Sequence, residues 1–110
     1  MKKFCFDLDN TLCETYDGDY KNSKPIKDAI NSVNRLHEQG NYIIIYTARM
    51  MGRCNGNISL VYESIYELTK NQLNDWGLKY HNLILGKPEF DVLVDDKSIG
   101  FDKLWYKKII

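Results

Sequence analysis

One short run constrains the fold of this chain more than any other part of its sequence. Residues 42–46 read Tyr-Ile-Ile-Ile-Tyr, a nearly unbroken stretch of β-branched and aromatic side chains. Such a run predicts a strand that is buried on both faces, as is typical of parallel sheets. Parallel strands are joined by long crossovers, usually helices, so we expect helices on either side of this strand.

Two amphipathic segments flank the run, and in each of them apolar side chains recur at helical spacing. We expect the first helix to start at Pro25, with Ser23 as a candidate cap, and to end at Gly40. We expect the second helix to be capped by Ser59 and to end at Gly77.

Three further short apolar segments predict strands, namely residues 4–8, 83–85 and 92–94. The order strand, helix, strand, helix, strand, strand predicts an α/β fold, a three-layer Rossmann-like domain with a central parallel sheet. Residues 11–24 are polar and predict a loop or small hairpin, whereas the tail, residues 101–110, has no clear pattern.

The length of 110 residues indicates one domain over residues 1–110. Lys plus Arg (15) equals Asp plus Glu (15), which argues against nucleic acid or an anionic membrane as a partner. Asp7 and Asp9 interrupt the first apolar run, so no signal peptide is expected, and no run approaches the roughly 20 apolar residues of a membrane span. The three cysteines form no zinc pattern and favour a reducing compartment, so we expect a full-length cytoplasmic protein.

Distinctive polar residues follow the predicted strands at their carboxyl ends. They are Asp7, Asp9, Thr47, Lys87, Asp95 and Asp96. Because the carboxyl ends of parallel strands share one edge of a sheet, we expect these side chains to lie together. Ligands bind at that edge in α/β folds, so this is the predicted site.

The chemistry of these residues favours phosphoryl transfer. Asp7 and Asp9 stand two apart and leave the same face of a strand, where their carboxylates repel unless a cation neutralises them. Clustered carboxylates suit Mg²⁺, which also shields the charge of an incoming phosphate. Lys87 adds a fixed positive charge and Thr47 a hydroxyl donor for phosphate oxygens, and a carboxylate can form an aspartyl-phosphate.

Four motifs resemble those of the haloacid dehalogenase (HAD) superfamily. Residues 7–11, Asp-Leu-Asp-Asn-Thr, resemble its DxDxT motif, and residues 43–47 resemble its apolar strand ending in threonine or serine. Lys87 in Gly-Lys-Pro resembles the third motif, and residues 93–96, Leu-Val-Asp-Asp, the fourth. The motifs occur in the family's order and extend over nearly the whole chain.

The resemblance implies a role for each matched residue. Asp7 would attack phosphorus, and Asp9 would protonate the leaving alcohol and then activate the hydrolytic water. Thr47 and Lys87 would hold the phosphoryl oxygens, and Lys87 would also orient Asp7. The acid at position 9 favours a phosphatase over a dehalogenase, because dehalogenases of the superfamily lack it.

The resemblance also implies a Mg²⁺ site, with Asp96 as a direct ligand and Asp95 binding directly or through water. The expected ligand set is Asp7, Asp9 (through its backbone carbonyl), Asp95 and Asp96. Asn10 and Arg49 are candidate substrate contacts.

The gaps between the motifs hold no cap domain, so the chain resembles a capless member. Thr47-Ala48-Arg49 and Asp95-Asp96-Lys97 resemble small phosphatases of capsule and surface-polysaccharide biosynthesis. We therefore expect a Mg²⁺-dependent phosphomonoesterase that acts on a small-molecule phosphate ester, a sugar phosphate. The alternatives are a phosphatase acting on a protein or nucleic-acid end, and a non-catalytic phosphate-binding module. A second subunit covering the open site is a candidate partner.

Overall fold

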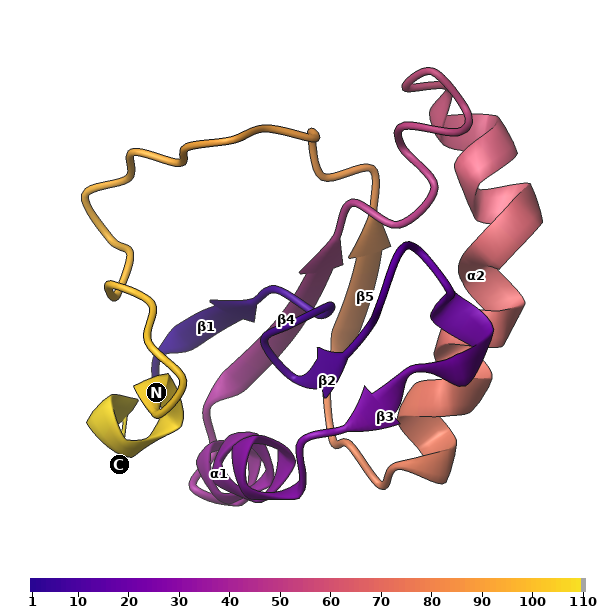
Figure 1. The fold of residues 1–110 in the computed structure, drawn as a ribbon. Coiled ribbons are helices and arrows are strands. Elements are labelled where there is room, and N and C mark those ends of the chain that lie inside the picture. The colour runs from indigo at the N-terminus through magenta and orange to yellow at the C-terminus, as the bar shows by residue number, and fades with distance from the viewer. Residues whose placement is uncertain (110) are drawn as a thin grey trace.

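A three-stranded parallel sheet lies at the centre of the computed structural model, which describes residues 1–109 (Figure 1). Its strands are β1 (Lys3–Phe6), β4 (Tyr42–Thr47) and β5 (Asn82–Leu85), in the order β1-β4-β5. Helix α1 (Lys27–Glu38) lies between β1 and β4 in the chain, and α2 (Ile58–Asp75) connects β4 to β5. The predicted class, a small Rossmann-like α/β domain, is confirmed.

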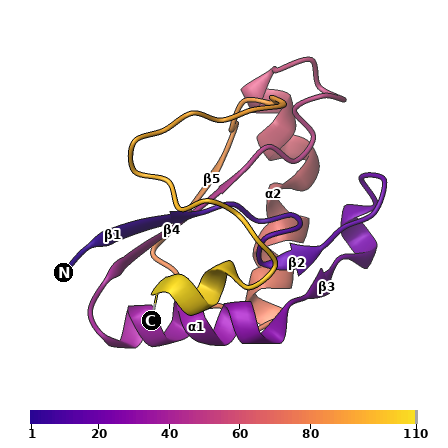
Figure 2. The same ribbon diagram turned by 60° about the vertical axis from the view of Figure 1, so that its left-hand side comes forward.

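The segment between β1 and α1 forms the expected small hairpin. Strands β2 (Cys13–Glu14) and β3 (Lys24–Pro25) pair antiparallel, and the short 3-10 helix η1 (Tyr20–Asn22) lies between them. A second 3-10 helix, η2 (Trp105–Ile109), forms in the tail and lies along α1 (Figure 2). No helix within residues 1–109 is long and apolar enough to cross a membrane.

The two faces of the central sheet differ in burial. The parallel register places Phe6, Ile45 and Leu83 on one face, where all three are buried in a single core with apolar residues of α1 and α2. On the opposite face Cys5 is exposed and Ile44 is half-buried. The expectation that β4 is buried on both faces is therefore wrong. Both crossovers step in the same direction across the sheet, and right-handed crossovers then place both helices on one face.

The helices end as predicted but begin differently. Gly40 and Gly77 follow the two helices with φ of 89° and 70°, a conformation that glycine adopts without strain. Pro25 lies in β3 rather than in α1, and no side chain caps α1. Helix α2 is capped by Asn57, whose side chain accepts a hydrogen bond from the Leu60 amide at 3.2 Å.

The predicted capping residues are therefore not the caps. Ser59 lies inside the first turn of α2 and is exposed. Ser23 instead hydrogen-bonds through its hydroxyl to Thr15 at 2.6 Å. Tertiary partners thus override the local capping preference at Ser23.

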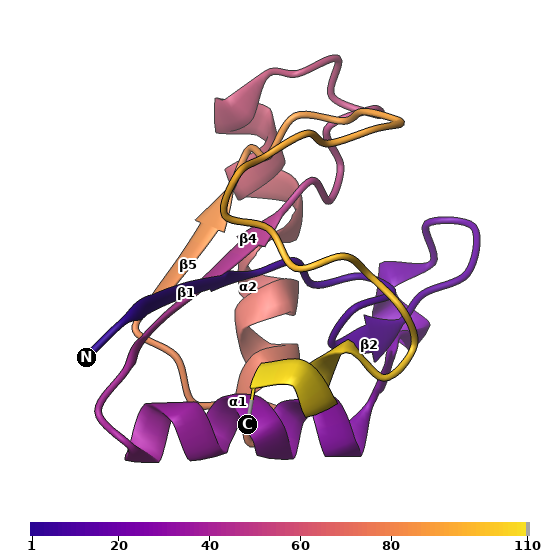
Figure 3. The ribbon, with the colours of Figure 1, turned by 90° about the vertical axis from the view of Figure 1, so that its left-hand side faces the viewer.

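The predicted fourth strand at residues 92–94 is not formed. These residues belong to a long irregular segment, residues 86–104, which we call the arch (Figures 1 and 3). Every residue from Pro88 to Leu104 is exposed, and Trp105 then returns to the core against Phe6. Within residues 1–109, β1 and β5 each pair only with β4, so residues 92–94 are paired with neither outer edge of the sheet. A strand is defined by hydrogen bonds to a neighbouring strand, and these residues make none.

Candidate active site

A tight turn directly after β1 builds the first part of the site. The carbonyl of Leu8 accepts hydrogen bonds from the amides of Thr11 and Leu12 at 3.2 and 2.8 Å. Asn10 has φ of 62°, a left-handed conformation that asparagine tolerates better than most residues. The turn ends β1 earlier than predicted and holds Asp7 and Asp9 against the carboxyl edge of the sheet.

Both carboxylate oxygens of Asp7 have a donor, yet the side chain stays accessible. Lys87 Nζ lies 3.2 Å from Asp7 Oδ1, and the Thr11 hydroxyl donates to Asp7 Oδ2 at 2.9 Å. The Asp7 side chain is 38% exposed, whereas that of Lys87 is 16% exposed. The Lys87 amide also donates to the Thr47 carbonyl at 3.1 Å, which ties this loop to the end of β4. Asp7 is thus oriented, charge-balanced and open to a ligand.

Thr47, the last residue of β4, is buried beside the same cavity. Its Oγ1 accepts a hydrogen bond from the Arg49 amide at 3.1 Å. A hydroxyl that accepts in this way keeps its own hydrogen to donate. Thr47 can therefore offer one donor to an oxyanion bound beside Asp7.

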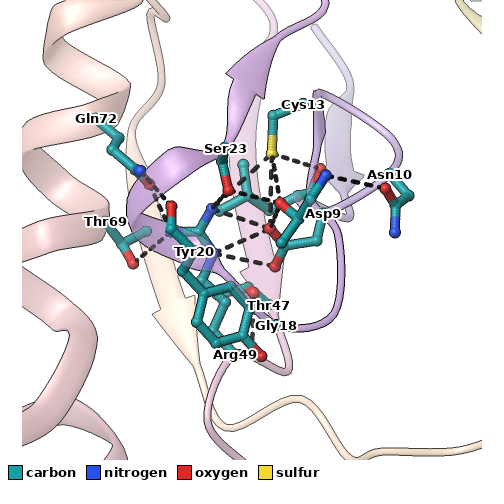
Figure 4. Close-up of polar contacts among 12 residues, drawn as sticks. Asp9, Asn10, Cys13, Gly18, Tyr20, Ser23, Thr47, Arg49, Thr69 and Gln72 are labelled. Carbon is teal, nitrogen blue, oxygen red and sulfur yellow. Dashed lines mark hydrogen bonds and ion pairs between the residues drawn. The ribbon is translucent and has the colours of Figure 1, made fainter.

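Asp9 is held in a dense polar network (Figure 4). Its Oδ1 lies 2.9 Å from Arg49 Nη2 and accepts from the Thr15 hydroxyl at 2.6 Å, and Arg49 Nε donates to Oδ2 at 3.0 Å. This is a bidentate, charge-assisted arrangement with strong directional preference. Oδ2 accepts from fewer donors than Oδ1, so it is the oxygen with more room to exchange a proton with a ligand.

The geometry gives Arg49 a role that differs from the predicted one. Its side chain is fully buried, and besides Asp9 it donates to Thr69 at 3.1 Å, to Gln72 at 2.7 Å and to Ser23 at 3.3 Å. Every N–H of the guanidinium therefore has a protein partner. Arg49 lines the cavity but has no donor left for a substrate, so it positions Asp9 instead.

Several contributors to this network were not recognised from the sequence. Tyr20 stacks on Arg49, with its ring centroid 5.0 Å from the Arg49 Cζ, and its carbonyl accepts from Gln72 at 2.6 Å. The sequence did contain an indication for Thr69 and Gln72. Both follow Ile65 at helical spacing, on the buried side of α2. Polar residues on an apolar stripe usually have a buried partner.

The cavity between these groups has a volume of about 490 Å³. The predicted site residues that line it are Asp7, Asp9, Asn10, Thr47 and Arg49. Asn10 uses its amide oxygen to accept from Thr15, which leaves its NH₂ group free to donate. At the rim the cavity also meets Asp17, Arg53 and Glu89.

Cys13 lies beside Asp9 and is fully buried. Burial, and secondarily the negative charge of Asp9, raise the pKa of this thiol to about 11. The hydrogen bond with Thr15 and the charge of Arg49 act in the opposite direction but are weaker. Cys13 is therefore a neutral packing residue rather than a nucleophile.

The structure does not bring Asp95 and Asp96 to the cavity. Both are exposed in the arch, where Asp95 Oδ1 accepts from the Lys97 amide at 2.9 Å. Among residues 1–109, no three acidic, histidine or cysteine side chains are grouped closely enough to hold a metal ion. Of the four expected ligands, Asp7 and Asp9 line the cavity, whereas Asp95 and Asp96 do not. The Mg²⁺ site stays a prediction.

Comparison with known proteins supports the fold and names no activity. No protein-family model matches the sequence, and no curated protein matches it significantly. The chain is similar to the crystal structure of a target protein from Vibrio cholerae, with a TM-score of 0.85 and 26% identity over 99% of this chain and 96% of that one. It also resembles part of a chain in the Pnkp1/Rnl/Hen1 RNA repair complex, with a TM-score of 0.54 and 17% identity. That match covers 98% of this chain but 30% of the other, and it shows a shared fold alone.

Proposed function

We propose that this chain is a phosphomonoesterase of the HAD type in which Asp7 is the nucleophile. One observation carries the proposal. The Asp7 carboxylate is held by Lys87 and Thr11 at the edge of a cavity and is still 38% exposed. A carboxylate that is oriented by its neighbours but left accessible is suited to attack an electrophile.

In the first step an Asp7 oxygen forms a bond to phosphorus while the bond from phosphorus to the leaving oxygen breaks. Asp9 enters this step protonated and gives its proton to the leaving oxygen, and an aspartyl-phosphate remains. In the second step a water oxygen bonds to phosphorus, its proton passes to Asp9, and the bond to Asp7 breaks. Thr47 and Lys87 donate to the phosphoryl oxygens, whose charge they stabilise in both steps.

Mg²⁺ remains part of the proposal, because two phosphate-facing carboxylates would otherwise repel an anionic substrate. It would supply charge neutralisation at the phosphoryl group. The four expected ligands do not converge within one chain, so no step above depends on the metal.

For the substrate we propose a small phosphate ester, a sugar phosphate of polysaccharide biosynthesis. The cavity volume of about 490 Å³ is within the range of small-molecule sites. The rim carries both an arginine and two carboxylates, a mixed lining that suits a polyhydroxylated leaving group. A phosphorylated protein or nucleic-acid end is a second class of substrate to test. The net charge of zero does not favour nucleic acid.

The test is hydrolysis of an aryl phosphate with added Mg²⁺, followed by a panel of sugar phosphates, nucleotides, phosphorylated nucleic-acid ends and phosphopeptides. We expect Asp7→Asn to lower kcat by at least about 10³-fold, because the variant lacks the attacking oxygen. Phosphate-dependent stabilisation against heat, measured on the same variant, reports whether the cavity still binds an anion.

The matched control is Asp28→Asn, which removes an exposed carboxylate in the first turn of α1. It should leave kcat unchanged. Activity that survives Asp7→Asn would refute the nucleophile assignment. Binding of phosphate with no turnover of any ester by the unaltered chain would instead support a non-catalytic phosphate-binding module.

A further inference from the structure

Arg53 lines the same cavity as Asp7 but lies at its rim, where the residue is exposed. Its Nη2 donates to the Gly18 carbonyl at 3.1 Å, and its Nη1 lies 3.7 Å from the Met50 sulfur, a weak acceptor. A guanidinium carries five N–H groups, and these two contacts leave three of them without a protein partner among residues 1–109. Arg53 therefore has donors for a ligand, which the buried Arg49 does not.

The guanidinium of Arg53 is held in a defined place. Its Cζ lies 5.6 Å from the centroid of the Tyr20 ring, and the same centroid lies 5.0 Å from the Cζ of Arg49 (Figure 4). A Cβ at Gly18 would lie 2.6 Å from Arg53 Nη2, so the glycine lets the guanidinium approach this loop closely. A donor that is already held by its own chain loses little conformational freedom when it binds a ligand.

Two carboxylates, those of Asp17 and Glu89, share the rim with Arg53. Both residues line the cavity and both are exposed. The Glu89 carboxylate lies over Gly52, where an added Cβ would be 2.9 Å from Glu89 Oε2. No ion pair among residues 1–109 includes Arg53, Asp17 or Glu89. The rim thus presents unpaired donors together with unpaired acceptors.

This lining fits a leaving group that carries hydroxyls and no charge. A sugar hydroxyl can donate to a carboxylate and accept from a guanidinium, so it can use both kinds of group at the rim. A second anionic group on the ester would meet two negative charges and one positive charge, which disfavours its binding. An apolar leaving group would take water from the rim without replacing its hydrogen bonds.

We propose that Arg53 is a specificity-determining residue and that, with Asp17 and Glu89, it forms a subsite for the hydroxyl groups of an uncharged sugar. This assignment rests on the proposed function, because it concerns the leaving group of that reaction. Arg53 acts on the choice of ester, whereas Asp7 and Asp9 carry the chemical steps.

The first test compares kcat/KM for two esters, phenyl phosphate and the hexose phosphate that the unaltered protein hydrolyses best. Arg53→Ala should lower kcat/KM for the hexose phosphate about tenfold more than for phenyl phosphate, mainly through a higher KM, because a phenyl group has no hydroxyls for the guanidinium. Arg53→Lys keeps the charge but lacks the planar fork, so it should change the ratio in the same direction. An equal loss for both esters would overturn the proposal.

The matched control is Arg35→Ala, which removes another exposed arginine, in the last turn of α1. It should leave the ratio of the two kcat/KM values unchanged. The unfolding temperature of each variant, measured by circular dichroism, shows whether the substitutions leave the fold intact. A ratio that falls equally in Arg35→Ala would show that the effect does not belong to the rim.

Glu89→Gln distinguishes hydroxyls from a second anionic group. If the rim binds hydroxyls, kcat/KM for the hexose phosphate should fall by about threefold, because an amide oxygen is a weaker acceptor than a carboxylate. If the rim binds an anion, removal of a negative charge should raise kcat/KM instead. The unaltered protein should also prefer a hexose monophosphate to a hexose bisphosphate. An increase in Glu89→Gln, or a preference for the bisphosphate, would overturn the proposal.

The subsite and the proposed function fail separately. Turnover of phenyl phosphate with an unchanged ester ratio in Arg53→Ala would overturn the subsite and leave the Asp7 assignment intact. Absence of turnover of every ester by the unaltered protein would refute the proposed function. Titration calorimetry would then decide the subsite, because Arg53→Ala should weaken binding of the hexose phosphate about tenfold more than that of inorganic phosphate. Equal weakening of both would overturn it.

Discussion

Arg49 and Asp9 form the most deeply buried charged pair of residues 1–109. The hydrogen-bond network around them joins three separate parts of the chain. Asp9 follows β1, Arg49 follows β4, and Thr69 with Gln72 belongs to α2. A buried arginine is costly to desolvate, so it is retained only where all of its donors are used. The Arg49 network therefore fixes the position of Asp9 relative to the helix layer and the sheet.

We predict that Arg49→Ala lowers the free energy of unfolding by about 3–5 kcal/mol, because it leaves the Asp9 carboxylate and two polar groups of α2 without their partner. Urea denaturation followed by circular dichroism measures the change. Lys79→Ala, which removes the exposed pair between Lys79 and Glu38, should cost less than about 1 kcal/mol. Equal losses of stability in the two variants would show that the buried Arg49 network stabilises the fold no more than the exposed pair does.

We predict that the raised pKa of the Cys13 thiol makes the protein less stable at high pH. Its pKa is raised to about 11 in the folded chain from the ordinary value of 9.0, so the unfolded chain loses this proton first. The folded state is therefore favoured fully below pH 9, and the advantage declines as the pH rises from 9 to 11. Thermal unfolding across this range should show a shallower decline for Cys13→Ala than for the unaltered protein. If the unfolding temperatures of the two proteins declined in parallel between pH 9 and pH 11, the raised pKa of Cys13 would be contradicted.

At the scale of elements, α2 serves as the platform of the site. Its first turn is held by Asn57, and its buried face presents both the apolar contacts of Val61 and Leu73 and the polar contacts of Gln72. A helix that holds Asp9 in place through Arg49 must start in a defined register, because one residue of slippage would turn Gln72 away from Arg49.

We predict that Asn57→Ala destabilises the protein by about 1 kcal/mol, because the Leu60 amide loses its side-chain acceptor. The matched control is Ser59→Ala, at the residue that the sequence pattern indicated as the cap but that lies inside the helix and is exposed. It should change the stability by less than half as much. Urea unfolding of the two variants compares them directly, and a larger effect at Ser59 would show that the cap is misassigned.

At the scale of the whole molecule, the central sheet is open: within residues 1–109, β1 and β5 each pair only with β4, so each has one edge without a strand partner. The arch leaves seven large apolar side chains exposed. Unpaired strand edges and exposed apolar side chains are the parts of a fold that other structural elements usually cover.

The sequence by itself determined the strands and helices of the core and four of the polar residues at the carboxyl edge. The periodicity of residues 42–46 and of the two flanking helices is local, and so is the spacing of Asp7 and Asp9, so both could be interpreted without tertiary information. Lys87 and Thr47 followed from the rule that parallel strands end at one edge.

Only the tertiary structure decided which side chains those polar residues contact. Arg49 was expected at the substrate and is instead buried against Asp9, because its partners Thr69 and Gln72 are distant in sequence and no local pattern links them. The predicted strand at residues 92–94 has the composition of a strand, but a strand also needs hydrogen bonds to a neighbour, and the fold pairs this segment with neither outer strand of the sheet. Composition is a property of the segment, whereas hydrogen bonds and burial depend on what the rest of the fold places next to it.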